Sequence, residues 1–134
     1  MRRRDFVGAS TVVMAGLSIG SARAQSKVTV IYVGGWDCPP CNVWKKNDKE
    51  PWLASDLHKK VNFVQVESPR LKEAYQDKYW PPELLPIRDK LPLKSNTPRF
   101  IVVNDGKIVA NEWGENSKGT AWSRTQSAIR KAVG

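Results

Sequence analysis

The residues of this chain that are best suited to chemistry are two cysteines separated by two prolines. The segment Trp36-Asp37-Cys38-Pro39-Pro40-Cys41 holds the only two cysteines of the 134 residues. Positions i and i+3 of a helix share a face, so the two sulfurs can close a small disulfide or open to a dithiol. A cysteine at a helix N-terminus also meets free N–H groups and the positive end of the helix dipole, which favour the thiolate. Because the thiolate is the attacking species in disulfide exchange, the spacing points to redox chemistry.

Two other interpretations of the pair are an inert structural disulfide and one half of a metal site. Zinc sites use about four nitrogen or sulfur ligands, and beyond the two cysteines the sequence offers only His58. A structural bridge across two residues closes a very short loop, which constrains the unfolded chain little. We therefore favour a redox pair and expect neither a metal ion nor a cofactor.

The first 24 residues are typical of an export signal. Arg2-Arg3-Arg4 gives a charged start, and residues 6–22 carry no charge. Ala22-Arg23-Ala24 places small residues at the −3 and −1 positions of a cleavage site before Gln25. The uncharged run is short and rich in Gly, Ser and Thr, so a retained membrane span is the weaker alternative.

The sequence Arg3-Arg4-Asp5-Phe6-Val7 also resembles a twin-arginine signal. We expect export to a bacterial periplasm, with cleavage after Ala24. This compartment fits the cysteines, since disulfide chemistry persists there.

Residues 25–134 have the length of one domain. Removing residues 1–24 lowers the formal charge from +9 to +6, because four arginines and one aspartate leave together. The remaining lysines are scattered along the chain, as on a solvated surface. No nucleic-acid-binding motif is present, so we expect no nucleic-acid partner, and we expect a monomer.

The first half of this domain alternates strands and helices. Residues 28–33 form a β-branched, nearly continuous apolar run, which predicts a strand covered on both faces. A helix is expected from Cys41 to about Lys49, with a kink or a new start at Pro51 and an apolar stripe that continues to Lys60. Residues 61–66 predict a second strand, parallel to the first.

After the second strand, Ser68-Pro69 is typical of an N-cap followed by proline at the first helical position, and predicts a helix to about Tyr79. Residues 81–96 contain four prolines among apolar residues. This composition predicts a short helix or a packed loop that covers the sheet, or alternatively a flap that contacts a partner.

The last third of the chain predicts a hairpin and a helix. Asp105-Gly106 lies between two apolar runs, which is a strong signal for two antiparallel strands. Gly114 ends the second strand. Asn116 or Ser117 is the expected cap of a last helix, whose apolar residues recur at helical spacing up to Val133.

The order of these elements resembles the thioredoxin family over about residues 27–133. Two features carry the resemblance: the aromatic-led Cys-x-x-Cys from Trp36 to Cys41, and Thr97-Pro98 just before the hairpin. The resemblance implies an α/β thioredoxin-like fold with a four-stranded mixed sheet and helices on both faces. It also implies a cis Thr97-Pro98 bond beside the cysteines, which leaves the preceding backbone free to bind an extended substrate peptide. Asp37 departs from cytosolic thioredoxins, which place tryptophan directly before the first cysteine.

The resemblance implies a periplasmic thiol–disulfide oxidoreductase that reduces disulfides of exported proteins. Cys38 is the expected exposed nucleophile, and Cys41 is the shielded thiol that resolves the mixed disulfide. The expected supporting residues at the substrate site are Trp36, Pro39, Pro40, Thr97 and Pro98. The partners of such an oxidoreductase would be the disulfides or thiols of exported proteins and a membrane or periplasmic electron donor.

The alternative function is a non-catalytic thioredoxin-like binding module, or a copper carrier that uses both sulfurs as soft ligands. Dedicated copper carriers usually add a His or Met ligand. The domain 25–134 contains no methionine, which favours the oxidoreductase.

Overall fold

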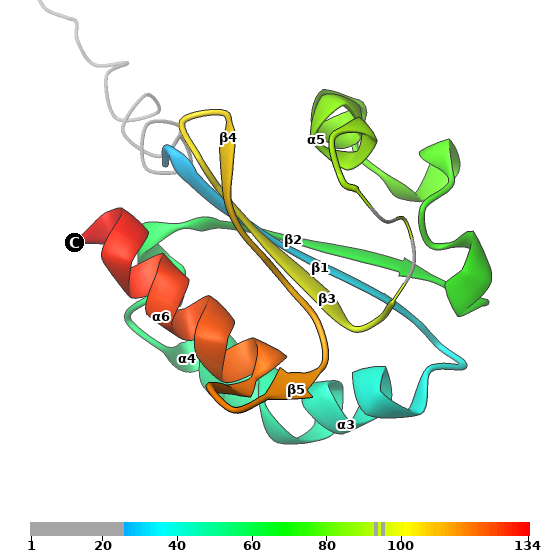
Figure 1. Ribbon diagram of the computed structural model, residues 1–134, viewed down its shortest axis with the longest axis horizontal. Coiled ribbons are helices and arrows are strands. Elements are labelled where there is room, and N and C mark those ends of the chain that lie inside the picture. Colours follow the sequence, from blue (N-terminus) through cyan, green and yellow to red (C-terminus); the bar gives the residue numbers. More distant parts are fainter. Residues whose placement is uncertain (1–25, 93, 95) are drawn as a thin grey trace, which may run out of the picture.

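A four-stranded mixed sheet forms the centre of the structure, a computed structural model that describes residues 26–134 except 93 and 95 (Figure 1). The strands lie in the order β2-β1-β3-β4. β1 pairs with β2 in parallel, whereas the β1–β3 and β3–β4 pairs are antiparallel. The strand bounds are Val28–Gly35 for β1, Asn62–Ser68 for β2, Arg99–Asn104 for β3 and Lys107–Glu112 for β4. The predicted sheet is therefore confirmed. The expected signal peptide, residues 1–24, lies outside the described residues.

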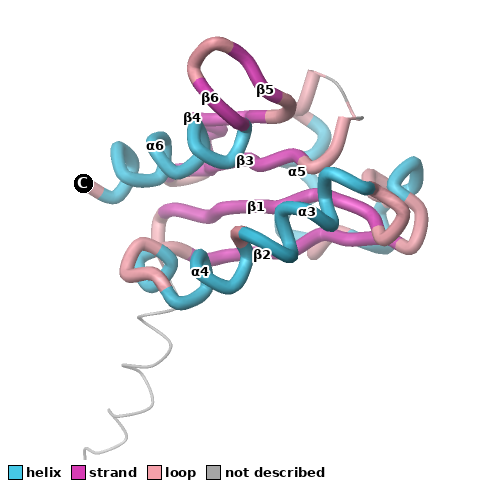
Figure 2. The backbone as a smooth tube through the Cα atoms, turned by 90° about the horizontal axis from the view of Figure 1, so that it is seen from below, coloured by secondary structure: helices cyan, strands magenta, loops and turns pink. Residues whose placement is uncertain are grey.

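Helical layers cover both faces of the sheet, as expected (Figures 1 and 2). One face carries α3, α4 and α6, and the other carries α5 with several short 3₁₀ turns. The helix bounds are Pro39–Asn47 for α3, Lys49–Ala54 for α4, Leu85–Asp89 for α5 and Ala121–Val133 for α6. Within the described part of the chain, no helix is long and apolar enough to cross a membrane.

β1 lies at the centre of both cores. Val30 and Tyr32 belong to the hydrophobic cluster beneath α3, α4 and α6, whereas Ile31 and Val33 belong to the cluster beneath α5. All four side chains are 0% exposed. Successive side chains of a strand point to opposite faces, so a strand covered on both faces needs a nearly unbroken apolar run.

The helix expected after the cysteines is divided into two. α3 ends at Asn47 and α4 begins at Lys49, which places Pro51 in the first turn of α4. The first N–H groups of a helix have no intrahelical partner, so proline costs little there. The new start near Pro51 is confirmed. The helix does not continue to Lys60, however, because α4 ends at Ala54 and only a 3₁₀ turn covers His58–Lys60.

The helix predicted from Ser68 to Tyr79 is absent. Ser68 is the last residue of β2, and only two 3₁₀ turns follow, at Leu71–Glu73 and Asp77–Tyr79. The Leu71 backbone packs against Gly35, where an added Cβ would lie 2.6 Å from the Leu71 Cα. The Asp37 carboxylate accepts a hydrogen bond from the Leu71 N–H at 2.7 Å. These contacts hold the segment against the end of β1, and this packing overrides the local helix signal.

The proline-rich segment covers the second face of the sheet. A 3₁₀ turn at Pro82–Leu84 leads into α5, and Ile87 and Leu91 are buried in the cluster on that face. The prediction of a short helix packed on the sheet is confirmed.

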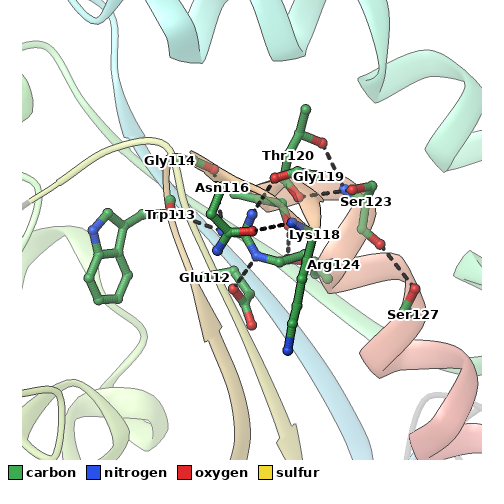
Figure 3. A network of polar contacts seen from close by, with 12 residues as sticks. Glu112, Trp113, Gly114, Asn116, Lys118, Gly119, Thr120, Ser123, Arg124 and Ser127 are labelled. Carbon is green, nitrogen blue, oxygen red and sulfur yellow. Dashed lines mark hydrogen bonds and ion pairs between the residues drawn. The ribbon is translucent and has the colours of Figure 1, made fainter.

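The cap predicted for the last helix is also wrong. Residues 115–120 form a small hairpin, β5 (Glu115–Asn116) with β6 (Gly119–Thr120), and α6 begins only at Ala121. The Asn116 Oδ1 accepts from the Lys118 N–H inside the hairpin, whereas the Thr120 Oγ1 accepts from the Ser123 N–H and caps α6 (Figure 3). The hairpin signal was missed because Asn and Ser favour turns as well as helix caps.

Arg124 ties this hairpin to the sheet and to α6 (Figure 3). Its Nε donates to Glu112 Oε1 at 2.7 Å, at the end of β4. Its Nη2 donates to the Trp113 carbonyl at 3.0 Å, and its Nη1 donates to the Gly119 carbonyl. One side chain of α6 thus fixes both ends of the connection that follows the sheet.

The packing of α6 on the sheet leads to a stability prediction. Ile129 is 0% exposed, whereas Val109 on β4 is 51% exposed. Ile129→Ala should lower the free energy of unfolding by about 2–5 kcal/mol, since it leaves a cavity in the core. Val109→Ala should change it by less than about 0.5 kcal/mol. Denaturant unfolding of both oxidised variants tests this, and equal losses would contradict the assignment of Ile129 to the core.

Candidate redox site

The two cysteines form a disulfide at the junction of β1 and α3. Cys38 is the N-cap residue of α3, and Cys41 lies in its first turn, with their Cα atoms 5.2 Å apart. Gly34 and Gly35 end β1, so the site lies at the carboxyl end of the central strand. The predicted pairing of the two sulfurs at a helix N-terminus is confirmed.

One backbone amide of α3 contacts the Cys38 sulfur. The Cys41 N–H donates to Cys38 Sγ at 3.2 Å, which is the geometry of a side-chain N-cap. Pro39 and Pro40, which lie between the two cysteines in sequence, have no N–H to offer. A thiolate on Cys38 would therefore keep one amide contact and the favourable end of the helix dipole.

Thr97 and Pro98 lie beside this sulfur, although they are far from it in sequence. The Thr97-Pro98 peptide bond is cis, as expected. The Thr97 Oγ1 lies 3.3 Å from Cys38 Sγ, so its hydroxyl can donate a hydrogen bond to a thiolate there. The structure thus brings Cys38, Cys41, Thr97 and Pro98 together.

The expected exposure of Cys38 is wrong for this oxidised form. Cys38 is 1% exposed and Cys41 is 0% exposed. The sulfur of Cys38 is covered because it lies between the α3 amide and Thr97. Trp36, in contrast, is 64% exposed. Its backbone is held by Ser68 and Asn42, and its side chain stands as an exposed apolar surface two residues before Cys38.

A groove of about 270 Å³ begins at Pro40, which lies between the two cysteines in sequence, although neither cysteine lines it. It extends from Pro40 of α3 across Pro98 to the hairpin that precedes α6, and its walls include Pro40, Val43, Pro98, Phe100, Gly114 and Thr120. Sequence analysis missed Val43, Phe100 and Thr120. Val43 is 56% exposed, so its apolar surface is available to a partner. A larger groove of about 450 Å³ lies between β4 and α6, and the cysteines do not line it.

A second group of side chains that sequence analysis missed lies beneath the disulfide. Tyr32 of β1 donates from its hydroxyl to Glu67 Oε2 of β2 at 3.2 Å, and Lys45 of α3 forms an ion pair with the same oxygen. Burial, and then the nearby Glu67 charge, raise the pKa of Tyr32 above its ordinary value. The Tyr32 hydroxyl therefore stays protonated under the cysteines.

The described residues contain no group of three or more His, Cys, Asp or Glu side chains that could hold a metal ion. His58 packs edge-on against Trp52 and Phe63, with ring centroids 5.2 and 5.9 Å away. This histidine is part of the aromatic packing around α4.

Comparison with known proteins finds similarity at the level of structure. No family model and no curated protein matches the sequence. Among solved structures, the chain resembles thioredoxin from Malassezia sympodialis, with 18% identity, a TM-score of 0.54 and coverage of 87% of this chain and 86% of that one. Oxidised thioredoxin O2 from Arabidopsis thaliana matches with 17% identity, a TM-score of 0.51 and coverage of 90% and 88%. Schistosoma mansoni thioredoxin matches with 17% identity, a TM-score of 0.50 and coverage of 87% and 86%.

These matches show that the chain has a thioredoxin-like fold. The Cys38-x-x-Cys41 disulfide is consistent with a protein of the thioredoxin family. At such low identity the likeness establishes the fold alone, and the activity must be argued from the site.

The Thr97 contact leads to a prediction about the reactivity of Cys38. Thr97→Val keeps the shape of the side chain but removes the hydroxyl, so the pKa of the Cys38 thiol should rise. Alkylation of Cys38 at neutral pH should slow about three- to tenfold, and its pH midpoint should move upward. Iodoacetamide kinetics in a Cys41→Ala background measure this.

Thr97→Ser is the matched control for that experiment, because it keeps the hydroxyl and should react like the parent. If the valine variant also reacts like the parent, the Thr97 hydroxyl does not stabilise the thiolate.

Proposed function

We propose that this protein is a thiol–disulfide oxidoreductase that reduces the disulfides of exported proteins through the Cys38–Cys41 couple. The observation that carries the proposal is the placement of Cys38 Sγ, 3.2 Å from the Cys41 amide and 3.3 Å from the Thr97 hydroxyl. Both groups stabilise negative charge on this sulfur, which an attacking thiolate requires.

The reaction transfers two electrons in two exchange steps. The Cys38 thiolate attacks one sulfur of a partner disulfide, which forms a mixed disulfide and releases the second partner sulfur as a thiolate. Cys41 then loses its proton and attacks Cys38 Sγ, which forms the Cys38–Cys41 disulfide and releases the first partner sulfur. The partner gains two electrons, and an external dithiol donor in the membrane or periplasm reduces the couple again.

The two prolines favour reduction of partners over their oxidation. A strongly oxidising couple needs a reduced form whose thiolate is very well stabilised. Pro39 and Pro40 remove two of the amides that would otherwise face Cys38 at the start of α3, so a single amide remains. This limits the stabilisation of the reduced form and supports a reductase.

The groove beside Pro98 suits an apolar, extended partner segment. Val43 in its wall has an exposed apolar side chain, and the exposed Trp36 lies two residues before Cys38 in sequence. Exposed apolar surface of this kind marks sites of association. We infer that the partner segment lies along this groove, with its disulfide sulfur facing Cys38.

The proposal of export rests on the sequence of residues 1–24, which has a charged start, an uncharged run and a small-residue cleavage site. Exported proteins acquire disulfides in the oxidising periplasm, which supplies the substrates that this function requires.

Single cysteine variants test the chemistry. Cys41→Ser should trap partners as mixed disulfides on Cys38, since the resolving thiol is gone. Cys38→Ser should abolish both turnover and trapping. Reduction of insulin disulfides and non-reducing gels of periplasmic extract measure the two effects.

The double variant that lacks both cysteines is the control for nonspecific capture. If the wild type shows no exchange activity, or Cys41→Ser captures nothing, the oxidoreductase is excluded and a binding module or copper carrier takes its place.

Export is tested separately. The periplasmic protein should begin at Gln25, as read by N-terminal sequencing, and replacement of Arg3 and Arg4 by lysine should stop export through the twin-arginine route. A periplasmic protein that keeps Met1 would contradict the cleavage site. Unchanged export of the lysine variant would assign the signal to the general route.

A further inference from the structure

The groove beside Pro98 has a floor of three aromatic rings. Trp44 of α3, Phe100 of β3 and Trp122 of α6 line it, and all three side chains are buried. Their ring centroids lie 5.0 to 5.3 Å apart. Because closely packed side chains of this kind move little, the floor is a fixed apolar surface. It suits the hydrocarbon part of a partner side chain.

The two ionisable side chains among the residues that line this groove are both acidic. Asp48 lies between α3 and α4, and Glu115 lies in β5. Lys46, Lys49 and Lys118 are close to them in sequence but do not line the groove. The chain as a whole has a positive net charge, so the groove carries the opposite sign to the rest of the protein.

Both carboxylates are available to a cation on a partner. Asp48 is the N-cap residue of α4, but its side chain makes no capping hydrogen bond. Glu115 is exposed, and the backbone beside it is held where the Gly114 carbonyl accepts from Arg124 Nη2 at 3.3 Å (Figure 3). Within the part of the chain that the structure describes, the ion pairs form at other carboxylates.

Lysine and arginine are the partner side chains that match this combination. Each has a hydrocarbon stem that can lie on an apolar surface while its charged head stays at the rim. Over the groove, the stem would cover the aromatic floor and the head would meet Asp48 and Glu115. An acidic side chain at the same place would be repelled by both carboxylates.

The length of α3 indicates where in the partner this basic residue lies. Cys38 caps the start of α3, and Asp48 follows its last residue, Asn47. At about 1.5 Å per helical residue, Cys38 and Asp48 are about 15 Å apart along the helix. An extended segment advances about 3.3 Å per residue. A segment bound along α3 therefore reaches Asp48 about four or five residues from its own cysteine.

We propose that this oxidoreductase selects partner segments that carry a lysine or arginine within about five residues of the disulfide cysteine, a specificity that rests on the function proposed above. Asp48 and Glu115 pair with the charged head, and the aromatic floor contacts its stem. The exchange steps at Cys38 stay the same. The charge pairs favour capture of the segment before its disulfide is attacked.

Peptide disulfides test this specificity. Each peptide carries one cysteine as a mixed disulfide with 2-nitro-5-thiobenzoate, and attack of Cys38 on the peptide sulfur releases this coloured thiolate. Three peptides differ only at the positions four residues before and after the cysteine, which hold arginine, alanine or glutamate. Each rate is divided by the rate of the same peptide with 2-mercaptoethanol, a neutral thiol, which corrects for the intrinsic reactivity of the peptide.

Reduced wild type at low ionic strength should react about five- to tenfold faster with the arginine peptide than with the glutamate peptide. About 0.5 M salt should remove most of this preference, because it screens charge pairs near the surface. The positive net charge of the chain by itself favours the glutamate peptide. A preference for arginine therefore has to come from the local carboxylates.

The double variant Asp48→Asn with Glu115→Gln should lower the arginine-to-glutamate ratio of rates to below about twofold. Asp56→Asn with Glu83→Gln is the matched control. It changes the net charge by the same amount at two exposed carboxylates that do not line the groove, so it should keep the wild-type ratio.

Equal rates of the wild type with the arginine and glutamate peptides would overturn the proposal. So would an unchanged ratio in the groove variant, or an equal loss in the control. Failure of the proposed function is a different result. In that case the wild type would release no more coloured thiolate from any peptide, the alanine peptide included, than the variant that lacks both cysteines.

Discussion

The burial of β1 on both faces is the constraint on which the geometry of the site depends. With Ile31 and Val33 packed toward α5 and Tyr32 packed toward α3, the strand is fixed in the sheet until it ends at Gly35. The stacking of Trp44 on Tyr32 then fixes α3 against the same strand. Cys38 and Cys41 are placed by these two contacts, one at the helix cap and the other facing the sheet. The packing of the core therefore also determines where the two sulfurs lie.

This constraint explains why the order of the elements could be predicted from the sequence. A strand covered on both faces requires the apolar run of residues 28–33, and the Asp105-Gly106 turn requires two antiparallel strands on either side of it. Pro51 could start a helix but not continue one. The Asp-Gly turn and the proline act through the local backbone, whereas the apolar run predicts a strand because it suits a position that is buried on both faces.

The predictions that failed depend on contacts between distant segments. Ser68-Pro69 has the local pattern of a helix start, but Gly35 and Asp37 hold the Leu71 backbone in 3₁₀ turns. Asn116 has the pattern of a helix cap, but the Arg124 contacts to the Trp113 and Gly119 carbonyls fix a hairpin there. A sequence pattern shows which local structure a segment favours. Contacts with distant residues such as Gly35 and Arg124 then determine which structure forms in the folded chain.

The residues of the site likewise divide into those that the sequence predicts and those that are brought together only by the fold. Cys38 and Cys41 follow from their spacing, and Thr97 and Pro98 follow from the family resemblance, but Glu67 and Lys45 carry no local signal. They are 22 residues apart, on different elements, and Tyr32 is 35 residues from Glu67. The fold gives the two sulfurs different surroundings. The Cys41 amide and the Thr97 hydroxyl both converge on Cys38, which stabilises a thiolate at that sulfur. Cys41 faces the Tyr32 side instead and is fully buried.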